Sequence, residues 1–337
     1  MRKYHGVLPV IVVSVLLEGL VGFVSWIQPG WTHLGQSARL NSSAPAAVSS
    51  VLPNPKYRML LGAYTALMGE KSTESAVEGR EAAMGRRYDM ELTYYDWRDP
   101  FPDQGEATMA AHDRIPVMTW YGPGKASYDD TTLSEVNSGA DDSWILRQAR
   151  AIRSFGRPIF LRLMIEMNGD WYKGYSGHPH QYVAAWRRVY DIFSRAGVKN
   201  VIWVWCPNLT PDNWNQYYPG DAYVDIIGVD GYNAWGEWVS PERMFGPFFA
   251  RYAGRKPLMI GETATNNEGY GAAAWIIDLR NYLEKVAGPR DGVIGVCWFD
   301  SDVNSAYDWR VDQTPASWKA WLGLARDPYF GGHGQGR

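Results

Sequence analysis

From Tyr57 onward, eight short runs of β-branched, aromatic and aliphatic residues alternate with amphipathic stretches. This alternation is typical of a parallel sheet whose strands are joined by crossover helices. The expected strands span residues 58–64, 89–94, 115–120, 158–165, 201–205, 225–229, 257–260 and 292–298. The clearest helical patterns span residues 142–155, 181–196, 241–252, 272–286 and 314–325.

Eight strand–helix units in about 270 residues predict a (β/α)8 barrel. The alternative is an open doubly wound sheet, which usually carries a glycine-rich phosphate-binding turn after its first strand. Here the first expected strand continues as Gly62-Ala-Tyr-Thr-Ala66, which is not such a turn. We therefore expect an α/β fold with one (β/α)8 TIM barrel domain at residues 55–330, followed by a tail at residues 331–337.

The N-terminal segment has the pattern of an export signal. Arg2 and Lys3 precede an almost continuous apolar run from Val7 to Ile27. The run is long enough to span a bilayer, but Glu18 lies near its centre and disfavours a span. We expect residues 1–28 to be either a cleaved signal peptide or an N-terminal membrane anchor, and residues 29–54 to be a flexible linker. Both alternatives place the rest of the chain outside the cytoplasm, secreted or at the cell surface.

Composition excludes several classes of function. The chain has 33 Lys and Arg against 36 Asp and Glu, so its net charge of −3 gives no electrostatic footprint for nucleic acid. Cys206 and Cys297 are too few for a disulfide scaffold or a cysteine-built zinc site. The 17 Trp and 21 Tyr must line either a large core or a binding cleft. No metal or other cofactor is implied, and the oligomeric state stays open.

Two glutamates follow expected strands directly. Glu166 follows the fourth strand and Glu262 ends the seventh. Barrel enzymes place their chemistry at these strand ends, and strands four and seven lie on opposing sides of the barrel, so the two carboxyl groups can converge. Hydrolysis of a glycosidic bond needs one carboxylic acid to protonate the leaving oxygen and one carboxylate to attack or stabilise the sugar carbon. The alternative is that both glutamates form structural salt bridges, in which case the reserve acids are Asp225, Asp230, Asp300 and Asp302.

Five segments carry a resemblance to a known family: 162–172 (Arg-Leu-Met-Ile-Glu-Met-Asn-Gly-Asp-Trp-Tyr), 204–208, 218–221, 228–232 and 260–262. Over roughly residues 155–310 the chain resembles glycoside hydrolase family 26, which is best known for endo-β-1,4-mannanases. The resemblance implies a retaining double displacement, with Glu166 as general acid/base and Glu262 as nucleophile. Retention requires the two carboxyl groups to be ~5–5.5 Å apart, whereas ~6.5–9.5 Å indicates inversion.

The same resemblance implies substrate-binding roles for residues near these glutamates. Tyr232 would donate a hydrogen bond to the nucleophile, and Trp298 would form the floor of the subsite where the bond is cleaved. Three further residues would shape the cleft beside the acid: Asn168, Trp171 and Tyr172.

Three more residues are candidates from their positions on strands. Arg162 lies four residues before Glu166 and would either support the nucleophile electrostatically or form an ion pair inside the barrel. Trp205, close to the end of strand five, and Trp120, at the end of strand three, are expected to line subsites.

The chain also departs from the family pattern. Mannanases of the family usually carry histidine immediately before the acid and after the Trp of strand three, where this chain has Ile165 and Tyr121. Thr263-Ala264 follow the nucleophile in place of the usual Phe-Gly. We expect a β-mannan substrate, with β-1,3-1,4-glucan, β-1,3-xylan and a catalytically silent carbohydrate-binding barrel as alternatives.

Overall fold

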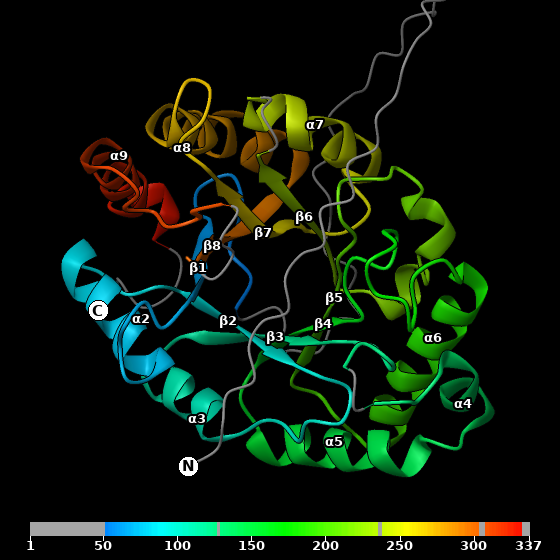
Figure 1. Cartoon of the computed structure of the whole chain (residues 1–337). Helices are drawn as coiled ribbons and strands as arrows, with labels where there is room; N and C mark the ends of the chain where they lie inside the picture. The colour runs from blue at the N-terminus through cyan, green and yellow to red at the C-terminus, as the bar shows by residue number, and fades with distance from the viewer. Residues whose placement is uncertain (1–50, 127–128, 235–237, 303–306, 332–337) are drawn as a thin grey trace, which may run out of the picture.

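The barrel closes around eight parallel strands taken in chain order, β1 to β8 (Figure 1). The computed structural model describes residues 51–126, 129–234, 238–302 and 307–331. The strands are β1 (Leu60–Thr65), β2 (Met90–Tyr95), β3 (Ile115–Trp120), β4 (Ile159–Leu163), β5 (Val201–Trp205), β6 (Ile226–Asn233), β7 (Leu258–Thr265) and β8 (Val293–Asp300). Pairing of β1 with β8, from Leu60 opposite Gly295 to Thr65 opposite Asp300, completes the ring. The expected (β/α)8 architecture is confirmed.

Helices surround the barrel on its outside (Figure 1). They are α2 (Thr73–Met84), α3 (Gln104–Ala111), α4 (Leu133–Ser138), α5 (Asp142–Phe155), α6 (Pro179–Arg195), α7 (Pro241–Tyr252), α8 (Ala272–Tyr282) and α9 (Pro315–Ala325). A π-helical segment, η3 (Leu283–Asp291), follows α8, and short 3₁₀ segments are η1 (Trp214–Tyr217), η2 (Asp221–Tyr223) and η4 (Pro328–Phe330). The bounds of α5 and α7 match the expected ones, whereas the expected helix 272–286 changes to π geometry after Tyr282.

The apolar core has two layers because successive side chains of a strand point to opposite faces. The inner layer fills the barrel with residues such as Met90, Val117, Phe160 and Ile202. The outer layer lies between the strands and the helices and is far richer in aromatic rings. Its fully buried tryptophans are Trp97, Trp120, Trp186, Trp205, Trp275, Trp298 and Trp321. Much of the high Trp content therefore builds the core of the domain.

The expected terminal segments fall mostly outside the described residues. This applies to residues 1–28, to all but the last four residues of the linker 29–54, and to all but the first residue of the tail 331–337. Their boundaries stay predictions. Within the described ranges, no helix has both the length and the apolar character that crossing a bilayer requires.

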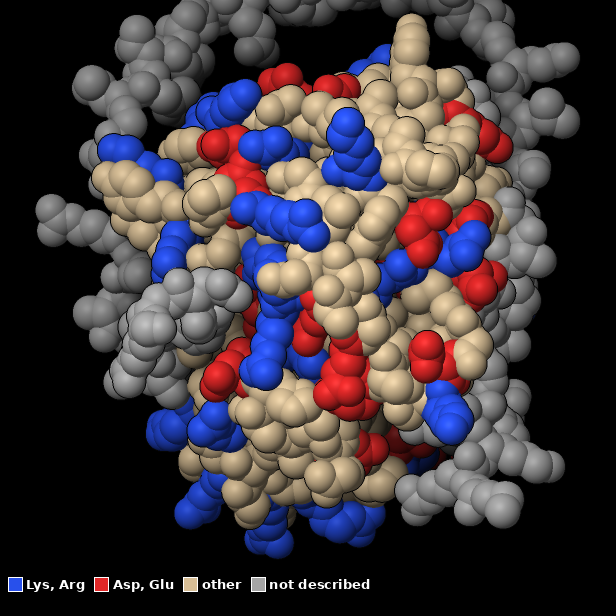
Figure 2. Space-filling view, turned by 90° about the vertical axis from the view of Figure 1, so that its left-hand side faces the viewer, with Lys and Arg blue, Asp and Glu red and all other residues tan. Residues whose placement is uncertain are grey.

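Charged side chains of both signs are mixed on the face shown in Figure 2, which is the left-hand side of Figure 1. Some ion pairs of the chain join elements distant in sequence. Arg80 of α2, for example, bonds the buried Asp300 at the end of β8 and Asp312 in the segment before α9, each at 2.7 Å. Neither sign of charge dominates this face.

Candidate active site

Glu166 stands on a strained turn that leaves the end of β4. Met164 and Glu166 have φ values of 46° and 52°, in the left-handed region that residues other than glycine rarely adopt. Two backbone hydrogen bonds hold the turn, from the Met164 amide to the Trp120 carbonyl at 2.8 Å and from the Glu166 amide to the Cys206 carbonyl at 2.9 Å. The ends of β3 and β5 thus fix the direction in which the Glu166 side chain leaves the barrel.

Two neutral donors hold the Glu166 carboxyl group. Asn208 Nδ2 donates to Oε1 at 2.8 Å, and Trp171 Nε1 donates to Oε2 at 2.9 Å. Asn168 does not touch this carboxyl in the structure. It positions Asn208, because its Nδ2 donates to the Asn208 carbonyl at 2.9 Å and its Oδ1 accepts from the Asn208 amide at 2.8 Å. Asn208 was not among the expected site residues, although it lies as close to the end of β5 as Glu166 lies to the end of β4.

The environment of Glu166 favours its protonated form. Burial and the nearby charge of Glu262 raise its pKa from the ordinary value of 4.5 to about 7. The hydrogen bonds from Asn208 and Trp171, and the charge of Arg162, oppose this rise without cancelling it. A carboxylic acid with such a pKa can donate a proton at neutral pH.

Glu262 has a different environment, because it is paired with a buried cation. Arg162 Nη1 donates to its Oε1 at 2.7 Å, and the Tyr232 hydroxyl donates to its Oε2 at 2.5 Å. The other end of the guanidinium bonds Asp230 Oδ2 at 2.5 Å, so Arg162 bridges two carboxylates. Arg162 and Asp230 are both fully buried. The geometry therefore holds Glu262 as an ion-paired carboxylate, with Arg162 and Tyr232 placed on it.

Local irregularities of β6 and β7 set the directions of the Asp230 and Glu262 side chains. The register shifts between Val229 and Asp230 and again after Ile260, and Asp230 then lies opposite Glu262. Such β-bulges redirect side chains at the rims of barrels. Gly261 is required beside them, since a Cβ at this position would lie 2.5 Å from Cys206 Sγ and 2.6 Å from Asp230 Oδ1.

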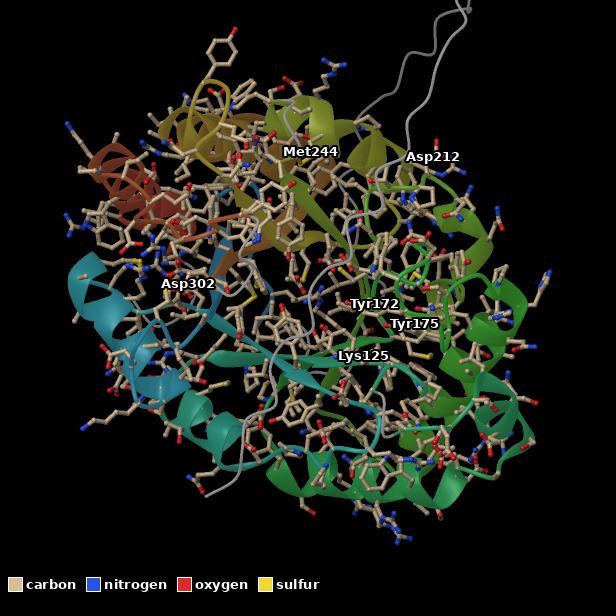
Figure 3. All side chains as sticks on the ribbon, viewed as in Figure 1. Lys125, Tyr172, Tyr175, Asp212, Met244 and Asp302 are labelled. Carbon is tan, nitrogen blue, oxygen red and sulfur yellow. The ribbon has the colours of Figure 1, made fainter. Side chains whose placement is uncertain are left out.

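A chain of aromatic rings, all partly exposed except the buried Trp309, connects Tyr232 beside Glu262 with Trp171 beside Glu166, and we name it the mouth ring. Neighbouring centroids lie between 4.9 and 6.4 Å apart. Its members, in spatial order, are Trp309, Tyr232, Phe299, Tyr64, Tyr94, Tyr121, Tyr172 and Trp171. Tyr172 also stacks on Tyr175, and Lys125 Nζ lies 3.7 Å from the Tyr121 ring centroid, on the same side of the barrel (Figure 3).

Of the mouth ring, Tyr232, Trp171 and Tyr172 were expected at the site. Tyr64, Tyr94 and Phe299 were missed, although they lie at or near the ends of β1, β2 and β8. Their positions near the C-terminal ends of strands could have identified them, because the same criterion identified the glutamates.

The structure corrects the expected roles of Trp120, Trp205 and Trp298. All three are fully buried in the outer core layer, away from the barrel mouth. Trp120 and Trp298 donate their indole N–H groups to the carbonyls of Trp97 and Trp309, and Trp205 packs on the rings of Tyr218 and Tyr252. The prediction that these tryptophans line subsites, with Trp298 as the floor, is wrong. Their neighbours Tyr121 and Cys206 belong to the inner layer, and Phe299 stacks on Tyr64 of the mouth ring.

Three of the four reserve acids, Asp225, Asp230 and Asp300, have structural partners, and the fourth, Asp302, is exposed. Asp225 accepts the Trp203 amide at 2.9 Å, and Asp300 is fully buried in its ion pair with Arg80. Ile165, in the place of the family's usual histidine, is buried in the inner core layer, and its carbonyl accepts from the Tyr175 hydroxyl at 3.0 Å.

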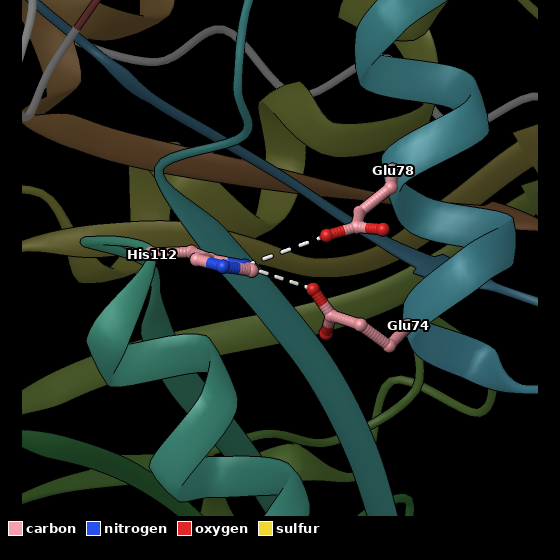
Figure 4. Close-up of side chains that lie close together, drawn as sticks. All are labelled: Glu74, Glu78 and His112. Carbon is pink, nitrogen blue, oxygen red and sulfur yellow. Dashed lines mark hydrogen bonds and ion pairs between the residues drawn. The ribbon is translucent and has the colours of Figure 1, made fainter.

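One further cluster has ligand types that metals use (Figure 4). His112 Nδ1 lies 2.9 Å from Glu74 Oε1 and 3.9 Å from Glu78 Oε1. Arg114 already bonds both oxygens of Glu74, at 3.1 and 3.3 Å. A cation held here would face that guanidinium, so we interpret the cluster as an ion-pair network that joins α2 to the start of β3.

Sequence comparison matches residues 130–268 to the profile of Glycosyl hydrolase family 26. Endoglucanase H of Acetivibrio thermocellus is 30% identical over 275 residues, which are 76% of this chain and 29% of that protein. A mannan endo-1,4-beta-mannosidase of Bacillus subtilis strain 168 is 27% identical over 135 residues, 37% of each chain. The chain therefore spans well under half the length of these relatives.

The fold has solved counterparts. A GH26 beta-mannanase from Bacteroides ovatus superposes with a TM-score of 0.63 at 15% identity, covering 84% of this chain and 94% of that one. A Cellulomonas fimi endo-beta-1,4-mannanase double mutant superposes with a TM-score of 0.63 at 17% identity, covering 87% of this chain and 77% of that one. At these identities the likeness concerns the fold alone. The profile match over residues 130–268, the aligned relatives and the closed eight-stranded barrel are the features that make this chain similar to glycosyl hydrolase family 26.

Proposed function

We propose that this chain is a retaining glycoside hydrolase that cleaves a β-linked polysaccharide. The observation that carries the proposal is the contrast between two carboxyl groups at one barrel mouth. Glu166 is held by neutral donors with a pKa raised to about 7, by burial and by the charge of Glu262. Glu262 is ion-paired with Arg162 and accepts from Tyr232. Paired carboxyl groups whose environments differ in this way suit one acid and one nucleophile.

In the first step, a Glu262 oxygen forms a bond to the anomeric carbon while the bond from that carbon to the leaving oxygen breaks. The Glu166 proton passes to the leaving oxygen, so Glu166 becomes a carboxylate and Glu262 becomes a glycosyl ester. The Tyr232 hydroxyl and the Arg162 guanidinium orient the Glu262 carboxylate for this attack.

In the second step, the Glu166 carboxylate takes a proton from water, and the water oxygen bonds to the anomeric carbon. The ester bond breaks, and Glu262 leaves as a carboxylate to which Arg162 and Tyr232 again donate. Each step inverts the anomeric carbon, so the product keeps the β configuration.

The mouth ring supports a saccharide substrate, because aromatic faces cover the C–H faces of pyranose rings. A barrel that only bound saccharide would have no use for a proton donor facing an ion-paired carboxylate.

We propose β-1,4-mannan as the first candidate substrate, since several relatives are named mannan endo-1,4-beta-mannosidases. A β-glucan is the second candidate. The alignment with the protein named Endoglucanase H covers 76% of this chain, whereas those with the mannosidases cover 25–40%. The presence of Ile165 and Tyr121, in place of the family's usual histidines, is a further reason to test β-glucan.

The test is hydrolysis of mannan, barley β-glucan and β-1,3-xylan by the wild type, Glu166→Gln and Glu262→Gln, with Glu242→Gln on the surface of α7 as the control. We expect one polymer to be cleaved, both active-site variants to lose at least about a thousandfold in kcat/KM, and the control to match the wild type. NMR of the first products gives the anomer. A first-formed α product, or a fully active Glu262→Gln, would refute the mechanism, and binding without cleavage would support the silent barrel.

We also propose that the enzyme acts outside the cytoplasm, as the apolar run after Arg2 and Lys3 indicates. Expression of the full chain with its own N-terminus should place activity in the medium or on the membrane. N-terminal sequencing distinguishes a cleaved signal from a retained anchor, and activity confined to the cytosol would refute export.

A further inference from the structure

A groove lies between α5 and α6 on the outside of the barrel, with a volume of about 460 Å³. Three arginines line it: Arg150 and Arg153 of α5, and Arg195 of α6. Leu146 and Ile192 contribute an apolar part of its wall. A second hollow of about 290 Å³ shares Arg195 and adds Arg187 and Arg188 of α6. The second hollow lies between Asn137 of α4 and α6, next to the first. We call these two hollows together the α5–α6 groove.

Helical spacing explains why these side chains meet. Leu146, Arg150 and Arg153 lie at positions i, i+4 and i+7 of α5, so they form one stripe along it. Ile192 and Arg195 lie three residues apart on α6 and face the same groove. The lining residues extend from Asn137 of α4 and Asp142, the first residue of α5, to Arg195, the last residue of α6, and lie on the outside of the barrel, whereas the two glutamates lie at the ends of its strands. The groove is therefore separate from the candidate active site.

The charge of the groove contrasts with that of the molecule. Five arginines line the two hollows against two acids, Asp142 and Asp191, which leaves a local charge of +3 in a chain with a net charge of −3. Arg188 bonds Asp142 through Nε and Nη2, both at 2.7 Å, so one of the two acids is already paired. Within the described part of the chain, neither Arg150 nor Arg195 forms an ion pair. The face shown in Figure 2, by comparison, has mixed charges.

Stabilisation of helix C-termini explains only some of the arginines in the groove. A cation in the last turn stabilises the negative end of a helix dipole, which explains Arg153 and Arg195 as isolated residues. It does not explain Arg150, nor why three guanidinium groups share one concave site, where like charges repel each other. A bound polyanion would offset that repulsion.

We propose that the α5–α6 groove binds an acidic polysaccharide through its carboxylate, sulfate or phosphate groups. Guanidinium groups pair with such oxyanions through two parallel hydrogen bonds. Leu146, which is half-buried beside the arginines, offers apolar contact to sugar C–H groups, which a free inorganic anion lacks. The site would hold an acidic glycan while the mouth remains open to its substrate, and the proposal does not depend on hydrolytic activity.

The experiment compares the wild-type full chain with two triple variants. The groove variant is Arg150→Gln/Arg153→Gln/Arg195→Gln. The control variant, with the same change in charge on α7, η3 and α9, is Arg243→Gln/Lys285→Gln/Lys319→Gln. Electrophoresis through gels that contain polygalacturonate, dextran sulfate or neutral dextran measures retardation. We expect the acidic polymers, and not neutral dextran, to retard the wild type and the control. The groove variant should bind the acidic polymers roughly tenfold more weakly or worse, with unchanged hydrolysis of the neutral substrate.

Competition distinguishes the sources of anionic groups. Inorganic phosphate at equal anion concentration should not displace polygalacturonate, and an RNA oligonucleotide should bind more weakly than the acidic glycan. Equal retardation of groove and control variants, binding of phosphate alone, or tighter binding of RNA would each overturn the proposal. If the triple variant does not fold, Arg150→Gln alone removes one exposed, unpaired charge and should still weaken binding measurably.

Discussion

The raised pKa of Glu166 has a consequence for stability that can be measured without any substrate. Burial and the charge of Glu262 raise this pKa to about 7, whereas in the unfolded chain it returns to the ordinary 4.5. Between these two values the folded protein holds a proton that the unfolded chain has released. The free energy of unfolding must then fall as the pH rises through this window.

The magnitude follows from the two pKa values. A difference of one unit between the folded and unfolded pKa corresponds to about 1.4 kcal/mol in the free energy of unfolding. The difference from 4.5 to about 7 therefore corresponds to about 3 kcal/mol. This contribution is fully present below pH 4.5 and is lost as the pH rises through 7. It is an upper value for one residue, because other groups titrate in the same range.

The variant Glu166→Gln isolates the effect of this residue. Glutamine does not titrate, but one of its amide N–H groups would face the N–H of Trp171 or Asn208, so the variant carries a constant offset in stability. Urea unfolding of both proteins from pH 4 to pH 8.5 gives the difference in free energy at each pH. We expect the wild type to lose about 3 kcal/mol relative to the variant across this range. A constant difference, or one that changes in the opposite direction, would show that the Glu166 pKa is not raised.

Four further outcomes are expected from the site geometry. The kcat/KM of the wild type should fall above about pH 7, and Trp171→Phe should move this fall to higher pH because it removes a hydrogen bond that opposes the raised pKa of Glu166. Tyr232→Phe should lower kcat/KM by about tenfold to a hundredfold, through loss of a hydrogen bond to a charged group. Arg162→Leu should cost about 3–5 kcal/mol in urea unfolding, since Asp230 and Glu262 lose their shared cation. Trp298→Ala should cost about 3–5 kcal/mol while KM stays unchanged, as fits a core residue.

The sequence predicted the barrel because its signals are local and repeated. Eight apolar runs at regular spacing specify the strand count, and the polar residues and glycines that flank helices such as α5 and α7 set their bounds closely. The placement of Glu166 and Glu262 at the mouth follows from the same rule, since Glu166 lies just after β4 and Glu262 lies in the C-terminal half of β7.

The sequence could not show which tryptophans face the mouth. Strands of a parallel barrel are buried on both faces, so apolar residues occur at odd and even positions alike and the pattern does not mark the inside. Trp203 and Trp205 are two residues apart and share the outer face, whereas Cys206 next to them faces inward. The bulges near Asp230 and Glu262 change the alternation again. The contact between Asp230 and Arg162, and the role of Asn168 in holding Asn208, depend on this three-dimensional detail.

The arrangement in which Arg162 bonds Asp230 and Glu262, while Glu166 has only neutral donors, has a consequence for inhibitor chemistry. When Glu166 loses its proton, its buried carboxylate adds a negative charge that no cation among the described residues bonds. Protonated imino sugars, in which an ammonium replaces the anomeric carbon, should bind there more tightly as the pH rises through 7. Their neutral lactam counterparts should not show this pH dependence.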